Sequence, residues 1–132
     1  MKRSVAFEYF GAGQYLEFTI GGLRELEKAL GGMAIGEIIQ NIGSLSVLSA
    51  GLMIGLRHHY RNRPLSFFDD KIEEHLDNGG KLEELFLPLA KALMVTGVFG
   101  KHIADAAETA ETDEDFANIA LSGDEEGEQK NA

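Results

Sequence analysis

The sequence predicts an α+β domain that is mainly α-helical: an N-terminal β-hairpin, a compact bundle of about five helices and an acidic C-terminal tail. Three observations favour this class. Apolar and polar residues alternate before residue 20, and apolar residues recur at helical spacing from residue 23 to residue 99. Residues 101–132 carry two lysines against ten acidic side chains. We therefore expect a folded domain over residues 1–100 and a largely disordered tail over residues 101–132.

The hairpin is predicted from two apolar runs, residues 5–10 and 14–20, separated by Gly11, Ala12 and Gly13. In the second run, apolar Leu16, Phe18 and Ile20 alternate with polar or amphipathic residues, so one face of this strand should be buried. A two-stranded hairpin is marginally stable by itself in water. It should therefore pack on the helices or pair with a partner's strand.

Two short helices are expected next, each followed by a glycine stop. Residues 23–30 place leucines on one side and charges on the other, and a second helix over residues 33–42 repeats isoleucine at helical spacing. The buried sets are Leu23, Leu26 and Leu30 in the first helix and Ile35, Ile38, Ile39 and Ile42 in the second.

Residues 44–60 predict the central helix, since they form the longest run without an acidic residue. Ser44 is a good N-cap, and leucines at 45, 48, 52 and 56 mark one face. Small residues such as Gly51 and Gly55 would allow close packing. A membrane span is the competing interpretation, but residues 42–56 give only 15 positions without a charge or an amide side chain, whereas a span needs about 20 apolar ones.

The last part of the bundle comprises a helix capped by Ser66, with Phe68, Ile72 and Leu76 as its apolar stripe, and a helical pattern over residues 81–99. Pro88 lies inside that pattern and lacks an amide hydrogen, so it should either kink one helix or divide it into two. Beyond residue 100 only a short helix from about residue 112 to Leu121 is expected.

No catalytic, cofactor or metal site is indicated by the sequence. The chain has no cysteine, His58 and His59 are adjacent on a predicted helix, and His75 and His102 stand apart from other histidines. The glycine pairs do not open a phosphate-binding helix, and the adjacent carboxylates have the pattern of a solvated helix face. We therefore expect a protein that is not an enzyme.

The charge balance argues against nucleic acid as a partner. The formal net charge is -10, and the one basic cluster, between Arg57 and Arg63, is explained by the dipole at the C-terminus of the central helix, with an anion site as the alternative. An interaction protein remains by elimination. Aromatic residues at helical spacing in a domain this small are more often core residues than surface ones. The candidate partner-binding residues are nevertheless the apolar side chains of the later helices: Phe67, Phe68, Ile72, Leu82, Phe86 and Phe99.

The order of elements, and above all the segment YLEFTIGGLRELEKALG beginning at Tyr15, resembles the tail assembly chaperones of long-tailed bacteriophages (siphoviruses) and related gene transfer agents. The resemblance spans residues 5–100. It implies a prophage or phage protein of the host bacterial cytoplasm that binds the tape-measure protein, keeps it soluble, promotes assembly of tail-tube subunits around it, and is absent from the mature virion. It also implies a longer frameshifted form and no catalytic residues.

A second function class remains open, because the tail charge also fits an acidic regulatory protein that blocks a basic nucleic-acid-binding surface by charge mimicry. Removal of residues 101–132 separates the two. A mimic should lose nearly all binding and depend steeply on salt, whereas a chaperone with an apolar groove should keep a salt-resistant component. Open strand edges on the hairpin also favour self-association as a homo-oligomer.

Overall fold

The computed structural model describes residues 3–109 and confirms a mainly helical α+β fold. A two-stranded antiparallel hairpin precedes six helices in the described residues. The elements are β1 (Val5–Ala6), β2 (Tyr15–Leu16), α1 (Ile20–Ala29), α2 (Ile35–Gln40), α3 (Leu45–Gly55), α4 (Leu65–Asp77), α5 (Leu82–Met94) and α6 (Lys101–Thr109).

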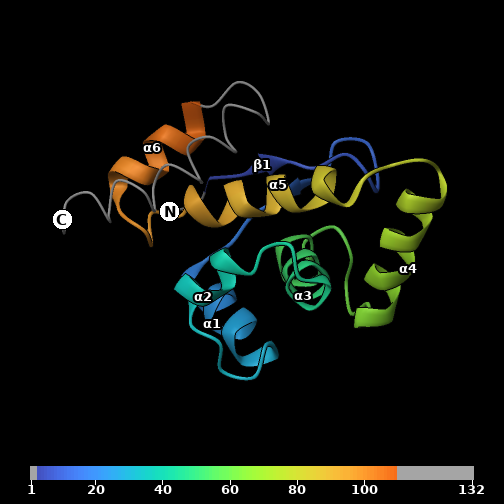
Figure 1. The fold of residues 1–132 in the computed structure, drawn as a ribbon, viewed down its shortest axis with the longest axis horizontal. Helices are drawn as coiled ribbons and strands as arrows, with labels where there is room; N and C mark the ends of the chain where they lie inside the picture. The colour runs from blue at the N-terminus through green and yellow to red at the C-terminus, as the bar shows by residue number, and fades with distance from the viewer. Residues whose placement is uncertain (1–2, 110–132) are drawn as a thin grey trace.

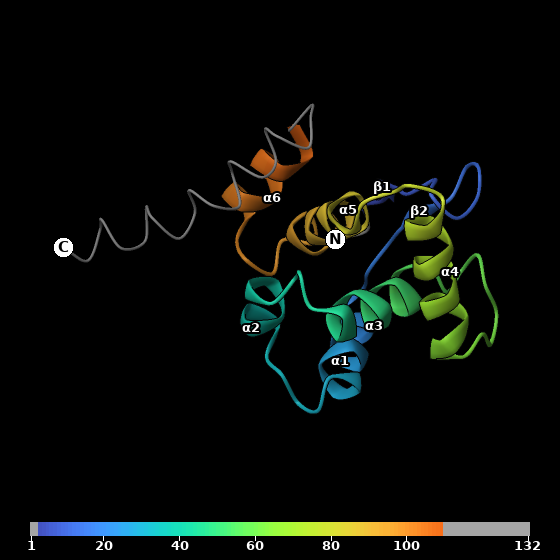
Figure 2. The same ribbon diagram turned by 45° about the vertical axis from the view of Figure 1, so that its right-hand side comes forward.

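Helices α3 and α5 form the centre of the molecule. Helix α3 contacts α1, α4, α5 and β2, and α5 contacts α3, α6 and both strands. In both views of the ribbon, α4 lies at one end of α5 and α6 at the other, and α2 lies on the side of α3 away from α4 (Figures 1 and 2). Helix α1 packs against α3. The prediction that the central segment of the chain forms a buried helix is therefore confirmed by α3.

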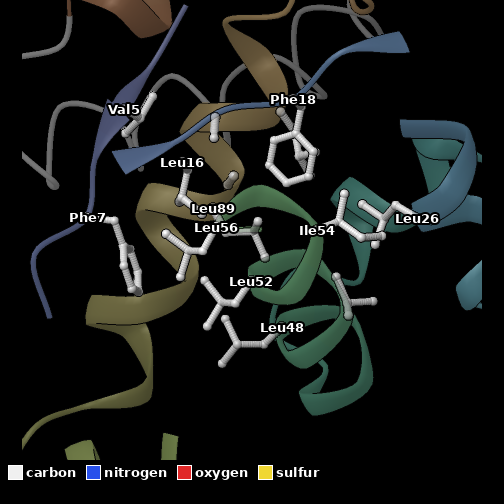
Figure 3. Close-up of a cluster of buried hydrophobic side chains, with 14 of the residues drawn as sticks. Val5, Phe7, Leu16, Phe18, Leu26, Leu48, Leu52, Ile54, Leu56 and Leu89 are labelled. Atoms are coloured by element: carbon white, nitrogen blue, oxygen red, sulfur yellow. The ribbon is translucent and has the colours of Figure 1, made fainter. Parts of the chain in front are cut away.

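One hydrophobic core joins the hairpin to these helices (Figure 3). Leu16 and Phe18 of the hairpin segment point toward the end of α3, and Leu89 of α5 packs against its middle. The helix comes this close because glycine occupies the contact points. A Cβ atom at Gly51 would lie 2.7 Å from Leu89 Cδ2, and one at Gly55 would lie 2.8 Å from Leu16 Cδ2.

The hairpin is confirmed, but its ladder is shorter than predicted. Val5 pairs with Leu16 and Ala6 with Tyr15, and Phe7 N–H donates to the Gln14 carbonyl at 2.9 Å. The second strand stops early because residue 17 leaves the hairpin: its N–H donates to the Gly55 carbonyl at the end of α3. Ile20 is therefore not a buried strand residue. It is exposed and begins α1.

Helix α1 begins three residues before the predicted start, because Thr19 acts as its N-cap and accepts a hydrogen bond from Gly22 N–H at 3.1 Å. Helix α2 is shorter than predicted, so Ile42 lies outside it, and of its three isoleucines only Ile38 is fully buried. Its first amide, Ile35 N–H, donates to Glu27 Oε2 at 2.8 Å, so a side chain from α1 fixes where α2 starts.

Two predictions about α3 and α4 are corrected. Ser44 caps α3 as expected, but the helix ends at Gly55 rather than at residue 60, and Leu45 is 59% exposed instead of facing the core. Helix α4 begins at Leu65, with Pro64 at the cap position and no side-chain cap. The predicted cap, Ser66, therefore lies inside the first turn.

The C-terminal end of the described chain differs most from the prediction. Helix α5 continues through Pro88 as one helix and ends at Met94, before residues 95–99. Residues 101–109, assigned to the largely disordered tail, form α6 instead. Ala104 and Ala107 are buried, and Arg3 pairs with Asp105 and Glu108 at 3.5 and 3.0 Å. The short helix predicted near residues 112–121 lies outside the described residues.

Candidate functional site

The six predicted partner-binding residues do not form one surface. Phe68 and Ile72 are core residues, only 1% and 4% exposed, because they are the side chains through which α4 packs on the bundle. The other four, Phe67, Leu82, Phe86 and Phe99, are partly buried against the core. Phe67 lies on α4 and Phe99 follows α5 beside α6, so these two are at opposite ends of α5 (Figure 1).

Phe67 has the most distinctive surroundings of the four. The Arg63 guanidinium carbon lies 5.0 Å from the centre of its ring and the Lys71 ammonium 5.7 Å from it. Phe67 and Lys71 are spaced by four, so they lie on one side of α4, and Arg63 precedes the helix by two residues. Glu74 continues that side with an ion pair to Lys71 at 4.0 Å. We call Arg63, Phe67, Lys71 and Glu74 the Phe67 stripe.

The inner side of the Phe67 ring is held by aromatic contacts. Tyr60 and Phe68 pack against it at centroid distances of 5.1 and 5.2 Å. Each cation is attracted by the ring face, which fixes the orientation of two flexible side chains. The stripe is thus a rigid aromatic group flanked by two positive charges, a combination suited to binding an apolar side chain with acidic neighbours.

A second cluster joins the hairpin to the loop between α3 and α4. Tyr15 lies 4.5 Å from His58 and 4.7 Å from His59, measured between ring centroids, and its N–H donates to His59 Nε2 at 3.0 Å. Burial lowers the pKa of His58, and the neighbouring His59 lowers it further. We call Tyr15, His58 and His59 the hairpin–histidine cluster.

The basic cluster is not a simple cap of α3. Because α3 ends at Gly55, the residues of the basic cluster belong to the loop after the helix and make separate contacts. Arg57 pairs with Glu25 of α1, and Arg63 contributes to the Phe67 stripe. Reasoning from the dipole missed both contacts. The spacing of Arg63, Phe67 and Lys71 was the signal in the sequence that could have revealed the stripe.

In the turn between α4 and α5, the Glu84 carboxylate contacts two neighbouring groups. Glu84 Oε1 accepts a hydrogen bond from Lys81 N–H at 2.6 Å and lies 3.3 Å from His75 Nε2. The backbone hydrogen bond is the main reason that the pKa of Glu84 is lowered, with a smaller contribution from His75. This arrangement closes a turn and caps a helix, which is a structural role.

Residues 3–109 contain no group of three or more His, Asp or Glu side chains arranged to hold a metal ion. Within the same residues no helix is long and apolar enough to cross a bilayer.

Comparison of the chain with protein-family models, with curated proteins and with solved structures finds no match.

Proposed function

We propose that this chain is a tail assembly chaperone that binds a tape-measure protein through the Phe67 stripe and keeps it soluble. The observation that supports the proposal is the partly exposed Phe67 ring of α4, flanked by Lys71 of the same helix and by Arg63 just before it. The resemblance of residues 5–100 to that family supplies the partner.

A tape-measure protein presents long amphipathic helices, so a chaperone must cover apolar stripes that would otherwise aggregate. An aromatic ring offers a large contact area at little entropic cost, and such rings are common anchors in protein interfaces. Arg63 and Lys71 would pair with acidic residues beside the partner's apolar stripe. The proposed contact is thus one aromatic anchor with charged flanks.

The core cannot supply this anchor. Phe68 and Ile72 hold α4 to the bundle, so exposing them would require α4 to separate from α3. Phe67 needs no such rearrangement. For this reason the proposal keeps only one of the predicted residues of α4 as a binding residue.

The experiment is co-expression of the full chain with the long helical protein encoded downstream of its gene. The soluble fraction of that protein is measured at low and high salt. We expect the wild-type chain to keep it soluble at both, and Phe67→Ala to weaken co-purification about tenfold, which corresponds to the loss of about 1.4 kcal/mol of binding free energy.

Phe99→Ala is the matched control, because Phe99 is also a partly buried phenylalanine packed on the core but lies at the other end of α5. It should leave binding unchanged. Equal loss in both variants would contradict a role for the Phe67 stripe. Binding that disappears at high salt would instead favour the acidic regulator, and a partner that stays insoluble beside the wild-type chain would reject the chaperone.

A further inference from the structure

The chain from Gly55, the last residue of α3, to Tyr60 runs beside β2. It occupies the outer edge of β2 with three separate contacts. In the first contact, Gln14 Nε2 donates to the Tyr60 hydroxyl at 2.8 Å. In the second, Tyr15 N–H donates to His59 Nε2 at 3.0 Å. In the third, Glu17 N–H donates to the Gly55 carbonyl at 3.1 Å. Two backbone donors of an otherwise open strand edge are satisfied in this way. The middle contact is the only one of the three that depends on a histidine.

We propose that His59 is a pH-sensitive latch that covers the edge of β2 when neutral and releases the Tyr15 amide when protonated. The geometry requires this coupling. A ring nitrogen can accept a hydrogen bond only through its lone pair, and protonation places a hydrogen on that same nitrogen. The Tyr15 N–H and the protonated ring would then be two donors facing each other, so the contact must open.

The charged groups around His59 are arranged unevenly. Three groups come from the segment of His59 itself. Arg57 is a cation paired with Glu25, the His58 ring lies 4.1 Å from the His59 ring between centroids, and Tyr60 contributes its phenol. The packed hairpin contributes the Tyr15 phenol and the carboxylate Glu17, which acts on His58. Positive charges on His58 and His59 at the same time are unfavourable. The pKa of His58 is lowered by burial and by the neighbouring His59, in agreement with this repulsion.

Opening the latch has a limited structural effect. Leu16 and Phe18 stay in the core, and the Glu17 contact with Gly55 uses only backbone atoms that do not titrate. The Tyr15 N–H becomes free to bind water or the carbonyl of an added strand. The latch therefore controls access to one position of a strand edge, and this inference is independent of the proposed chaperone role.

The test is hydrogen exchange of the full chain by NMR at pH 7.5 and pH 5.5, with each amide corrected for its intrinsic exchange rate. Histidine side chains change charge between about pH 5 and pH 8, so we expect the protection of the Tyr15 amide to fall at least about threefold at pH 5.5. The Glu17 amide is the internal control and should keep its protection.

Two variants isolate the histidine. His59→Gln supplies an acceptor oxygen that does not titrate, so Tyr15 protection should become independent of pH. His75→Gln changes a histidine on α4 and should retain the wild-type response. The proposal is overturned if wild-type Tyr15 protection is the same at both pH values, or if His59→Gln loses protection on acidification as the wild type does.

Discussion

Helices α3 and α4 follow each other in the chain and pack together, yet they differ in how much of their surface is buried. Most residues of α3 are buried, because other elements contact it on several sides. Helix α4 buries only Phe68 and Ile72 fully and exposes most of its remaining length. A substitution at a buried position of α3 should therefore cost more stability than one on the outer side of α4.

The largest contrast is expected between two leucines, one on each helix. Leu52 of α3 is fully buried, so Leu52→Ala should leave a cavity and lower the free energy of unfolding by about 2–5 kcal/mol. Leu76 of α4 is 41% exposed, and Leu76→Ala should cost less than about 1 kcal/mol. Urea denaturation of both variants measures the difference. Similar losses would mean that α4 is as well packed as α3.

A glycine substitution should give the next largest effect. Gly55→Ala would place a Cβ atom 2.9 Å from the rigid Phe18 ring and 2.8 Å from Leu16 Cδ2, and overpacking of this kind costs about 1–3 kcal/mol. Gly36 is also helical, but a Cβ there meets nothing within 4 Å, so Gly36→Ala should stabilise the fold by about 0.4–1 kcal/mol. Thermal unfolding would show opposite shifts, and a stabilised Gly55→Ala would contradict the close packing.

Local pattern explains why α3 could be predicted from the sequence. Its continuous apolar composition, its Ser44 cap and its small residues are all properties of one segment, and each has the expected role. Its C-terminal boundary could not be predicted in the same way, because the Gly55 carbonyl bonds to the amide of residue 17, 38 positions earlier. Long-range contacts of this kind leave no periodic signal.

Helix α6 shows the same limit more strongly. Its composition is acidic and rich in alanine, which favours disorder when the segment is considered alone. In the structure Ala104 and Ala107 are small enough to pack closely, and Arg3, from the other end of the chain, pairs with two of its acidic residues. The segment thus packs on α5, which it contacts directly, and pairs with a residue about 100 positions away.

The candidate site was only partly predictable for a related reason. Phe67 and Phe68 are adjacent phenylalanines on one helix, and composition cannot decide which of them faces the core. The packing of α4 on α3 decides it, burying Phe68 and leaving Phe67 at the surface. The sequence therefore placed both phenylalanines on one helix but could not decide which of them is exposed.

The junction between the two helices should show a smaller effect. The buried Ser49 hydroxyl of α3 donates to Asp69 Oδ1 of α4 at 2.5 Å. Ser49→Ala removes this hydrogen bond, but Asp69 is exposed and regains water, so we expect a loss of about 1 kcal/mol in urea denaturation. Ser46→Ala, at an exposed position of α3, is the control and should be neutral. No loss in Ser49→Ala would mean that the hydrogen bond adds nothing to α3–α4 packing.

The smallest expected effect concerns His58, in the loop that joins α3 to α4. Its pKa is lowered in the folded protein, by burial first and by His59 second, so the unfolded chain binds more protons just below the ordinary value of 6.5. Stability contributed by the neutral side chain is thus present above that pH and is lost as the pH falls through the folded-state pKa. Urea denaturation at pH 7.5 and 5.5 should therefore show a smaller acid-induced loss in His58→Gln than in the wild type. An equal loss in both proteins would show that the loop between the helices does not couple folding to this proton.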